Sequence, residues 1–284
     1  MTPVTHVSDT ARWVAFYRAM ESERADAIFR DPFARRLAGP EGERIVHDLP
    51  KGRQMAWPMI VRTAVMDEII LRAVARDGVD TILNLAAGLD ARPYRLPLPP
   101  ALRWFDVDLP NMIAYKREQL AGERPACALE SVALDLADRP ARQALFESVG
   151  AGARTALVMT EGLLVYLEAD DVADVAGDLH AQRSFRWWLL DLASPGLLKM
   201  LERSWGPVLR AGNAPFRFAP AEGTAFFQRF GWREVEYRSM WEEARRLGRR
   251  MRFAVLWDVV GRLAPSHKRE EFKRFSGVVL LERG

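Results

Sequence analysis

The sequence predicts an α/β fold, with a doubly wound, mostly parallel sheet, an antiparallel edge pair and an N-terminal helical lid. Two observations carry this prediction. Five apolar segments of strand length alternate with segments of helical periodicity along the middle of the chain. Right-handed crossovers between such strands give a parallel sheet with helices on both faces. In addition, four of the expected strands end at a glycine or a carboxylate, at the edge where such sheets bind ligands.

The elements follow from hydrophobic periodicity and from the residues that interrupt it. The expected parallel strands cover residues 79–86, 102–108, 129–134, 155–160 and 185–192. The segments 234–239 and 277–282 are expected to form the final antiparallel pair. Helices are expected at residues 8–39, with a break at Asp31-Pro32 and an end at Gly39-Pro40, and at 58–76, 111–120, 139–149, 170–181 and 219–230.

The whole chain is expected to form a single domain with four parts. Residues 1–57 supply the N-terminal helical lid, and residues 58–193 form the cofactor-binding core. Residues 194–218 are an insertion, which is expected to be irregular from 195 onward because it contains three prolines. Residues 219–284 complete the sheet. The lid and the insertion are expected to close over the site.

The composition excludes several classes of protein. The chain has 284 residues, of which 49% are hydrophobic, which suffices for one large core. Its net charge of +3 gives little attraction to nucleic acid, and its four histidines lie far apart and form no metal-binding motif. Cys127 is the single cysteine, so a disulfide within the chain is excluded. We find no signal peptide and no membrane-spanning segment, so a cytoplasmic protein without nucleic-acid, membrane or metal partners is expected.

The strand ends predict a nucleoside-like ligand. Gly88 follows the first strand and allows the backbone to approach a ligand closely. Asp108 lies twenty residues later, at the end of the second strand. This is about the ~20-residue spacing of the acid that holds a ribose diol. Asp106 lies on the same face of that strand and competes for the role.

The segment around Gly88 lacks the dinucleotide fingerprint G-x-G-x-x-G. Residues 85–91 instead have the sequence LAAGLDA. A pyrophosphate would therefore lack its usual glycine-lined cradle, whereas a nucleoside cofactor without phosphates tolerates this sequence better. A strand–turn–helix with one turn glycine is the purely structural alternative.

Several motifs, taken in chain order, match one known family. They are 84–92 (NLAAGLDAR), 106–110 (DVDLP) with Lys116, 135–136 (DL) and 161–167 (EGLLVYL), together with 18–22 (RAMES), 31–34 (DPFA) and Gly231-Trp232. This ensemble resembles the leucine carboxyl methyltransferase family, and more closely its bacterial branch of methyltransferases that depend on S-adenosylmethionine (SAM). The resemblance covers roughly residues 8 to 240 and implies a class I methyltransferase fold with SAM at the strand ends.

The resemblance also implies roles for individual residues. Arg62 would pair with the methionine carboxylate of SAM, and Glu161 would lie near its amine. Gly88 would lie under the cofactor, and Asp108 would hold the ribose. The other residues expected at the cofactor are Ala86, Asp106, Leu109, Asp135, Leu136 and Gly162.

Asp135 and Leu136 would frame the adenine, the acid near its exocyclic amine and the leucine against its ring. Ala86 stands where the family has the first glycine of Gly-x-Gly. Its methyl group is small, so we expect the pocket to persist with slightly altered backbone contact.

The expected reaction is methyl transfer to an oxygen, a carboxylate or a hydroxyl, of a small-molecule acceptor. Glu161 and Tyr166 are the candidate catalytic residues, although core packing also explains Tyr166. The matched motifs contain no histidine, which favours a carboxylate or an acidic hydroxyl as the acceptor. Trp57, Trp205 and Trp241 are candidates for an aromatic acceptor pocket.

Three alternatives stay open. In the first alternative, the chemistry is the same but the acceptor is a protein carboxyl group. In the second, the chain is an NAD-dependent oxidoreductase with a similar sheet. A third alternative is nucleic-acid binding through the arginines of residues 245–252, which ion pairs on a solvated helix explain more simply. The sequence leaves the oligomeric state open.

Overall fold

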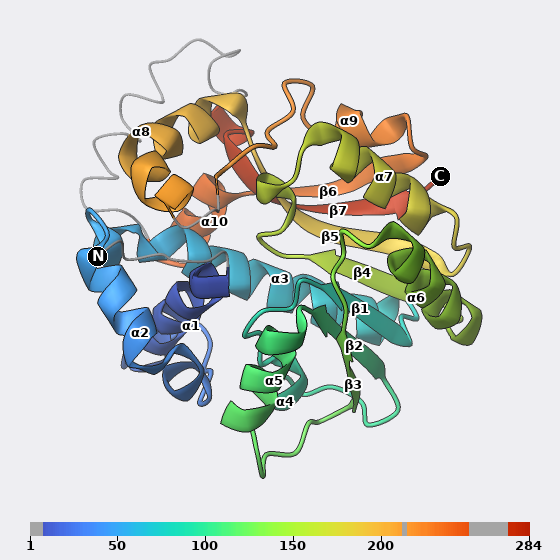
Figure 1. Ribbon diagram of the computed structural model, residues 1–284, viewed down its shortest axis with the longest axis horizontal. Coiled ribbons are helices and arrows are strands. Elements are labelled where there is room, and N and C mark those ends of the chain that lie inside the picture. The colour runs from blue at the N-terminus through green and yellow to red at the C-terminus, as the bar shows by residue number, and fades with distance from the viewer. Residues whose placement is uncertain (1–7, 212–214, 250–271) are drawn as a thin grey trace.

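The computed structural model describes residues 8–211, 215–249 and 272–284. Within these residues, seven strands form one sheet in the order β3-β2-β1-β4-β5-β7-β6 (Figure 1). The strands are β1 (Thr81–Leu85), β2 (Arg103–Asp108), β3 (Ala128–Ala133), β4 (Ala156–Thr160), β5 (Phe185–Ala193), β6 (Trp232–Ser239) and β7 (Ser276–Arg283). Strands β1 to β5 are parallel, and β7 runs antiparallel to both β5 and β6. The predicted sheet, including its antiparallel edge pair, is confirmed.

Helices cover both faces of the sheet. They are α1 (Ser8–Ser22), α2 (Ala34–Asp48), α3 (Ala56–Arg76), α4 (Arg92–Arg95), α5 (Pro110–Gln119), α6 (Arg139–Gly152), α7 (Ala169–His180), α8 (Pro195–Ala211), α9 (Ala225–Gln228) and α10 (Met240–Arg246). Apolar side chains of α6, α7 and α9 pack on one face, and those of α3 and α10 pack on the other. The result is a three-layer α/β/α sandwich.

The alternation of side chains along the strands explains the two cores. In β1, Leu83 and Leu85 join the core under α6 and α7, whereas Ile82 joins the core under α3. In β5, Trp188 is fully buried in the first core, where its indole N–H donates to Thr160 Oγ1 at 2.9 Å. Its neighbour Trp187 packs against the second core, as expected for adjacent residues of a strand.

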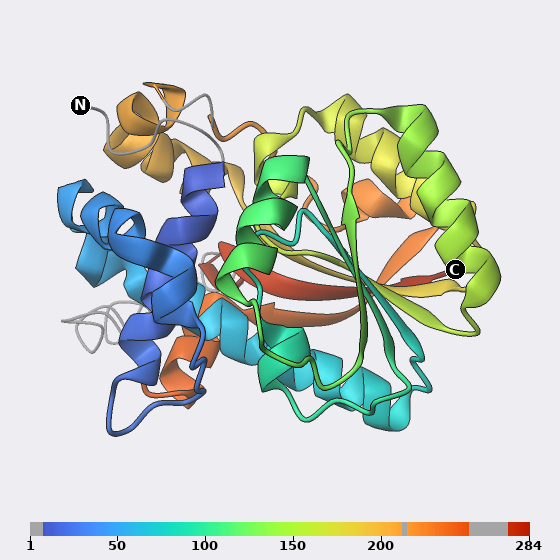
Figure 2. The ribbon, with the colours of Figure 1, turned by 60° about the horizontal axis from the view of Figure 1, so that its bottom comes forward.

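The N-terminal helices lie beyond the carboxyl ends of the parallel strands, on the same side of the sheet as α8 (Figures 1 and 2). They form a third apolar cluster of their own with residues of α3 and α8. Trp13 of α1 packs edge-on against Trp205 of α8, with 5.6 Å between the ring centroids. Arg18 donates from Nη2 to the carbonyl of Leu89 at 2.5 Å, which fastens α1 to the turn after β1. The N-terminal segment therefore packs directly over the strand ends.

The structure corrects four predicted elements. The expected helical stretch 8–39 is interrupted, because α1 ends at Ser22 and α2 begins at Ala34. Residues 195–211 form the helix α8, because Leu197, Leu201 and Trp205 recur at helical spacing and Pro195 stands at the first position, which needs no N–H donor. The predicted helix 219–230 shrinks to α9, with turns before it. Gly39, at φ 60°, kinks α2 and does not end it, since the helix continues to Asp48.

The turn after β1 places an alanine in a conformation that favours glycine. Ala86 has φ 53° and Gly88 has φ 50°, so both residues adopt the left-handed region. An L-residue with a side chain pays about 1–2 kcal/mol there. The strain at Ala86 shows why a glycine suits this position.

We predict that Ala86→Gly raises the free energy of unfolding by about 0.5–1 kcal/mol, because relief of the left-handed strain exceeds the added entropy of the unfolded chain. The matched control is Ala87→Gly, at the neighbouring position without a positive φ, which should lower it by a similar amount. Urea unfolding of the two variants measures the difference. Equal destabilisation by both substitutions would contradict the prediction.

Candidate active site

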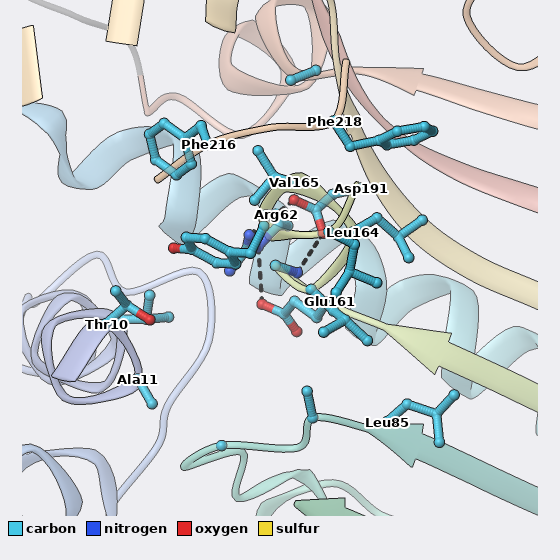
Figure 3. Close-up of a pocket in the computed structure, with 18 of the residues that line it drawn as sticks. Thr10, Ala11, Arg62, Leu85, Glu161, Leu164, Val165, Asp191, Phe216 and Phe218 are labelled. Atoms are coloured by element: carbon cyan, nitrogen blue, oxygen red, sulfur yellow. Dashed lines mark hydrogen bonds and ion pairs between the residues drawn. The ribbon is translucent and has the colours of Figure 1, made fainter. Parts of the chain in front are cut away.

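A cavity of about 1050 Å³ lies at the carboxyl ends of the parallel strands. Its walls come from the ends of β1 to β5, from α1, α3 and α8, and from residues 215–218 (Figure 3). Of the residues predicted at the site, Asp106 alone lies outside the described wall.

Asp108 forms a carboxylate site beside the turn after β1. Its Oδ2 accepts from the backbone N–H of Gly88 at 2.6 Å, and its Oδ1 accepts from that of Leu109 at 2.7 Å. Burial raises the pKa of Asp108, and these two hydrogen bonds offset the effect only in part. Each carboxylate oxygen can accept a further hydrogen bond. Asp108 is therefore held in a fixed orientation with capacity left for a pair of hydroxyls.

Asp106 has a different environment, although it lies only two residues earlier. It is fully buried and accepts from Lys116 Nζ at 2.7 Å and from Trp104 Nε1 at 2.9 Å. Asn84 Nδ2 lies 3.3 Å from its Oδ1. These contacts fasten β1, β2 and α5 to one another, so the geometry favours Asp108 over Asp106 for contact with a ligand.

Arg62 of α3 joins the ends of two strands. Its Nε donates to Glu161 Oε1 after β4, and its Nη1 donates to Asp191 Oδ2 near the end of β5, both at 3.0 Å (Figure 3). The other oxygen of Asp191 accepts from the backbone N–H of Gly162 at 2.6 Å. Gly162 has φ 64°, and a side chain there would begin 3.2 Å from the Arg62 guanidinium. Glycine therefore lets this arginine pass close to the backbone.

Arg92 continues the network toward the turn after β1. It donates to the second oxygen of Glu161 at 2.7 Å, to Asp90 at 2.7 Å and to Asp67 at 2.6 Å. Arg95 also binds Asp67, at 2.7 Å. We call this set the ion cluster; it consists of Arg62, Asp67, Asp90, Arg92, Arg95, Glu161 and Asp191.

The ion cluster contains three arginines and four carboxylates, so it has one excess negative charge. The adjoining Arg18–Asp31 pair is neutral and does not alter this balance. Burial alone would raise the pKa of Asp90 and of Glu161. The neighbouring guanidinium groups, Arg92 foremost, outweigh burial and lower both pKa values, so both groups are ionised at neutral pH. The cluster is thus suited to a ligand with a net positive charge.

Asp135 and Leu136 follow β3, the edge strand beside β2. The Asp135 carboxylate accepts from the backbone N–H of Ala137 at 2.9 Å, as in a tight turn. The carbonyl of Leu136 accepts from Arg142 at 2.7 Å, and Arg142 is itself paired with Asp178 at 2.6 Å. Both Asp135 and Leu136 line the cavity, together with Ala86, Leu109 and Gly162.

The two predicted catalytic residues also line the cavity, but neither is arranged as a strong proton acceptor. Both oxygens of Glu161 are held by arginines. Burial raises the pKa of Tyr166, and its hydrogen bond with Thr10 opposes this only in part, so the phenol is protonated at neutral pH. The Tyr166 ring lies 5.5 Å from that of Phe216.

Aromatic side chains form much of the rest of the cavity wall. Trp57, Trp205 and Trp241, which the sequence singles out, all contribute to it. The remaining aromatic wall residues are Trp13, Tyr166, Phe216, Phe218, Phe272 and Phe275.

Sequence reasoning missed Asp67, Asp90, Arg92 and Asp191 as residues of the site. Asp191 carries the same signal as the other strand-end acids, a carboxylate near the end of an apolar strand. Asp67 and Arg92 have no such signal, because an acid within an amphipathic helix and an arginine in a short turn both have common structural explanations.

In the described part of the chain, His, Cys, Asp and Glu side chains form no group of three or more that fits a metal ion. None of the helices in these ranges has the length and apolar character needed to cross a bilayer.

Among solved structures, the chain resembles a DUF574 family protein from Streptomyces avermitilis, with 13% identity, a TM-score of 0.62 and coverage of 100% of this chain and 99% of that one. It also resembles a protein described as a "putative methyltransferase" from Thermobifida fusca, with 14% identity, a TM-score of 0.61 and coverage of 99% and 96%. At these identities the likeness shows the fold, which is that of class I methyltransferases, as predicted.

Among curated relatives, a protein of Mycobacteroides abscessus is 34% identical over 224 residues, which cover 75% of this chain and 68% of that protein. A protein of Streptomyces coelicolor is 36% identical over 177 residues, or 57% of this chain and 60% of that protein. Both carry the name "Putative S-adenosyl-L-methionine-dependent methyltransferase". The matches with the S. coelicolor protein and with a further M. abscessus relative each span about three fifths of the relative's length.

The family model described as leucine carboxyl methyltransferase matches residues 11–179, which is more than half of the chain. This range contains the turn after β1, the ribose-site candidate Asp108 and both arginines that hold Glu161. The chain therefore belongs to the leucine carboxyl methyltransferase family.

Proposed function

We propose that the protein is a SAM-dependent methyltransferase that transfers a methyl group to an oxygen, a carboxylate or a hydroxyl, of a small-molecule acceptor. The observation that carries this proposal is the ion cluster, with its excess negative charge, in the same cavity as Asp108. The names of the curated relatives support the cofactor. A protein carboxyl group is the alternative acceptor within the same chemistry.

SAM matches the ion cluster in charge. It combines a sulfonium and an ammonium with one carboxylate, so it carries a net positive charge. Glu161 suits the ammonium, because its pKa is lowered and it stays ionised. Arg62 suits the methionine carboxylate, because a guanidinium has five N–H donors and only Nε and Nη1 are used in the pairs with Glu161 and Asp191.

The rest of the cofactor fits the adjoining wall. Asp108 would hold the ribose diol with its remaining acceptor capacity, and Gly88 would leave room for the cofactor above the backbone. Asp135 would accept from the exocyclic amine of the adenine, and Leu136 would pack on its ring. These are the roles that the family resemblance implies, and the hydrogen bonds that fix Asp108 and Asp135 support them.

When bound, SAM supplies a methyl group that its sulfonium activates. The chain's own contribution is then orientation and exclusion of water. The N-terminal helices and α8, which pack on each other through Trp13 and Trp205, form the proposed lid. The arginine pairs that hold Glu161 fix it as an orienting group.

The geometry disfavours the two alternatives from other classes. NAD carries two phosphates, which the excess negative charge of the ion cluster would repel and which lack a glycine-rich cradle here. Nucleic-acid binding through the basic segment is disfavoured because Arg246 and Arg249 already pair with acidic residues of α1, α3 and α10.

Isothermal titration calorimetry tests the cofactor. We expect S-adenosylhomocysteine (SAH) to bind the protein with a dissociation constant at or below about 100 μM, which corresponds to about −5.5 kcal/mol or tighter. NAD is the control and should give no heat of binding at the same concentrations. Binding of NAD in preference to SAH would contradict the proposal.

Asp108→Asn tests the ribose site. We expect it to weaken SAH binding at least about tenfold, or about 1.4 kcal/mol, because an amide cannot accept from both ribose hydroxyls as a carboxylate does. The melting temperature should fall modestly, since the single Asn oxygen can accept from Gly88 or from Leu109 but not from both.

The matched control is Asp106→Asn, two residues away on the same face of the strand. It should lower the melting temperature, because Lys116 loses its buried partner. The folded variant should bind SAH as tightly as the unsubstituted protein. Loss of affinity in Asp106→Asn, with none in Asp108→Asn, would reverse the assignment.

A further inference from the structure

We propose that the methyl acceptor is an apolar aromatic compound with an un-ionised hydroxyl, and that Asp191 accepts the proton of that hydroxyl. This inference rests on the proposed function and narrows its acceptor from a carboxylate or a hydroxyl to the hydroxyl. Three observations carry it: the size and composition of the cavity, the pairing of its arginines and the position of Asp191.

The cavity is large enough for a cofactor and an acceptor together. Its volume of about 1050 Å³ is at the upper limit of the roughly 300–1,000 Å³ that a single small-molecule site occupies. Its wall also includes the aromatic residues named above, and Met55, Met59, Leu197 and Leu201. Such a wall stabilises a flat apolar molecule by burial and by ring packing.

The cations of the described wall are already paired. There, six arginines and no lysine contribute to the cavity. Each of these arginines, Arg18, Arg62, Arg92, Arg139, Arg142 and Arg217, is paired with at least one carboxylate. A carboxylate acceptor would compete with these carboxylates for the arginines, whereas a neutral hydroxyl needs no counter-charge.

Asp191 is the carboxylate placed to serve that hydroxyl. It lies near the end of β5, between Arg62 and the segment that carries Phe216 and Phe218, whereas Glu161 lies toward β1 (Figure 3). Its side chain is 25% exposed, compared with 14% for Glu161.

The two carboxylates also differ in their hydrogen bonds. Asp191 accepts one bond on each oxygen, from Arg62 and from Gly162, and each oxygen can accept one more. Glu161 also accepts one bond on each oxygen, but both of its donors are charged guanidiniums, whereas Asp191 has only one such donor. Asp191 is therefore the better proton acceptor of the two.

The proposed step balances without another reactant. The acceptor oxygen forms a bond to the methyl carbon as the carbon–sulfur bond breaks, and the electron pair of that bond goes to sulfur. The hydroxyl proton goes to Asp191. A carboxylate suffices as the base, because the oxygen becomes strongly acidic as it is methylated, so proton transfer accompanies methyl transfer.

A binding experiment tests the acceptor class. Protein saturated with SAH is titrated by calorimetry with 2-naphthol and 9-phenanthrol, and with the matched carboxylates 2-naphthoate and 9-phenanthroate. We expect at least one phenol to bind at least tenfold more tightly than its matched carboxylate. Trp205→Leu should weaken that binding, whereas the control Trp187→Leu, outside the described wall, should not.

The outcomes separate this inference from the proposed function. No binding of SAH would reject the proposed cofactor. Binding of SAH together with equal or tighter binding of the carboxylates, or with no binding of either phenol, would reject only the acceptor assigned here.

A kinetic experiment tests Asp191, with Glu161 as the matched partner of Arg62. With radiolabelled SAM at saturating concentration and the phenol that binds most tightly, Asp191→Asn should lower kcat about 100-fold or more, a far larger change than its effect on the affinity for SAH. Glu161→Gln should chiefly raise the KM for SAM. Loss of SAH affinity alone in Asp191→Asn, equal kcat losses in both variants, or no labelled ether from a phenol that binds would overturn the assignment.

Discussion

The chain of ion pairs from Arg62 through Glu161 to Arg92 is the interaction on which the site depends. It joins α3, the turns after β1 and β4, and the end of β5, so it fixes three strand ends relative to one another. Removing one partner from such a buried set costs about 3–5 kcal/mol, because another charge is left uncompensated. The ion cluster therefore depends on all of its members. Its single unbalanced negative charge favours a cationic ligand.

The position of α1 and α8 follows from this arrangement and completes it. The parallel strands end at the ion cluster, and the apolar faces of α1 and α8 cover that edge of the sheet. Each charge of the cluster is covered together with a partner of opposite charge. Arg18 fastens α1 to the backbone after β1, while Trp13 and Trp205 fasten the two helices to each other. The wall of the cavity combines the ion cluster with a set of aromatic side chains. The charged groups suit the cofactor, and the aromatic groups suit the proposed acceptor.

Much of the fold and part of the site could be predicted from the sequence. Strand-length apolar runs predicted all seven strands, most clearly β1, β2 and β4, which are buried on both faces. Gly88, Asp108, Asp135 and Glu161 were found because strand ends converge on one edge of a sheet. The helix α8 was missed because prolines were given more weight than the apolar spacing between them.

The ion cluster could not be read from the chain, because its partners lie up to 129 residues apart and pair only after the sheet has formed. A crystal structure of the protein with SAH tests most directly whether these charges hold SAM. We predict the homocysteine amine beside Glu161, the carboxylate on Arg62 and the ribose on Asp108. A complex in which SAH lies outside this cavity, or contacts Asp108 but none of the ion cluster, would contradict it.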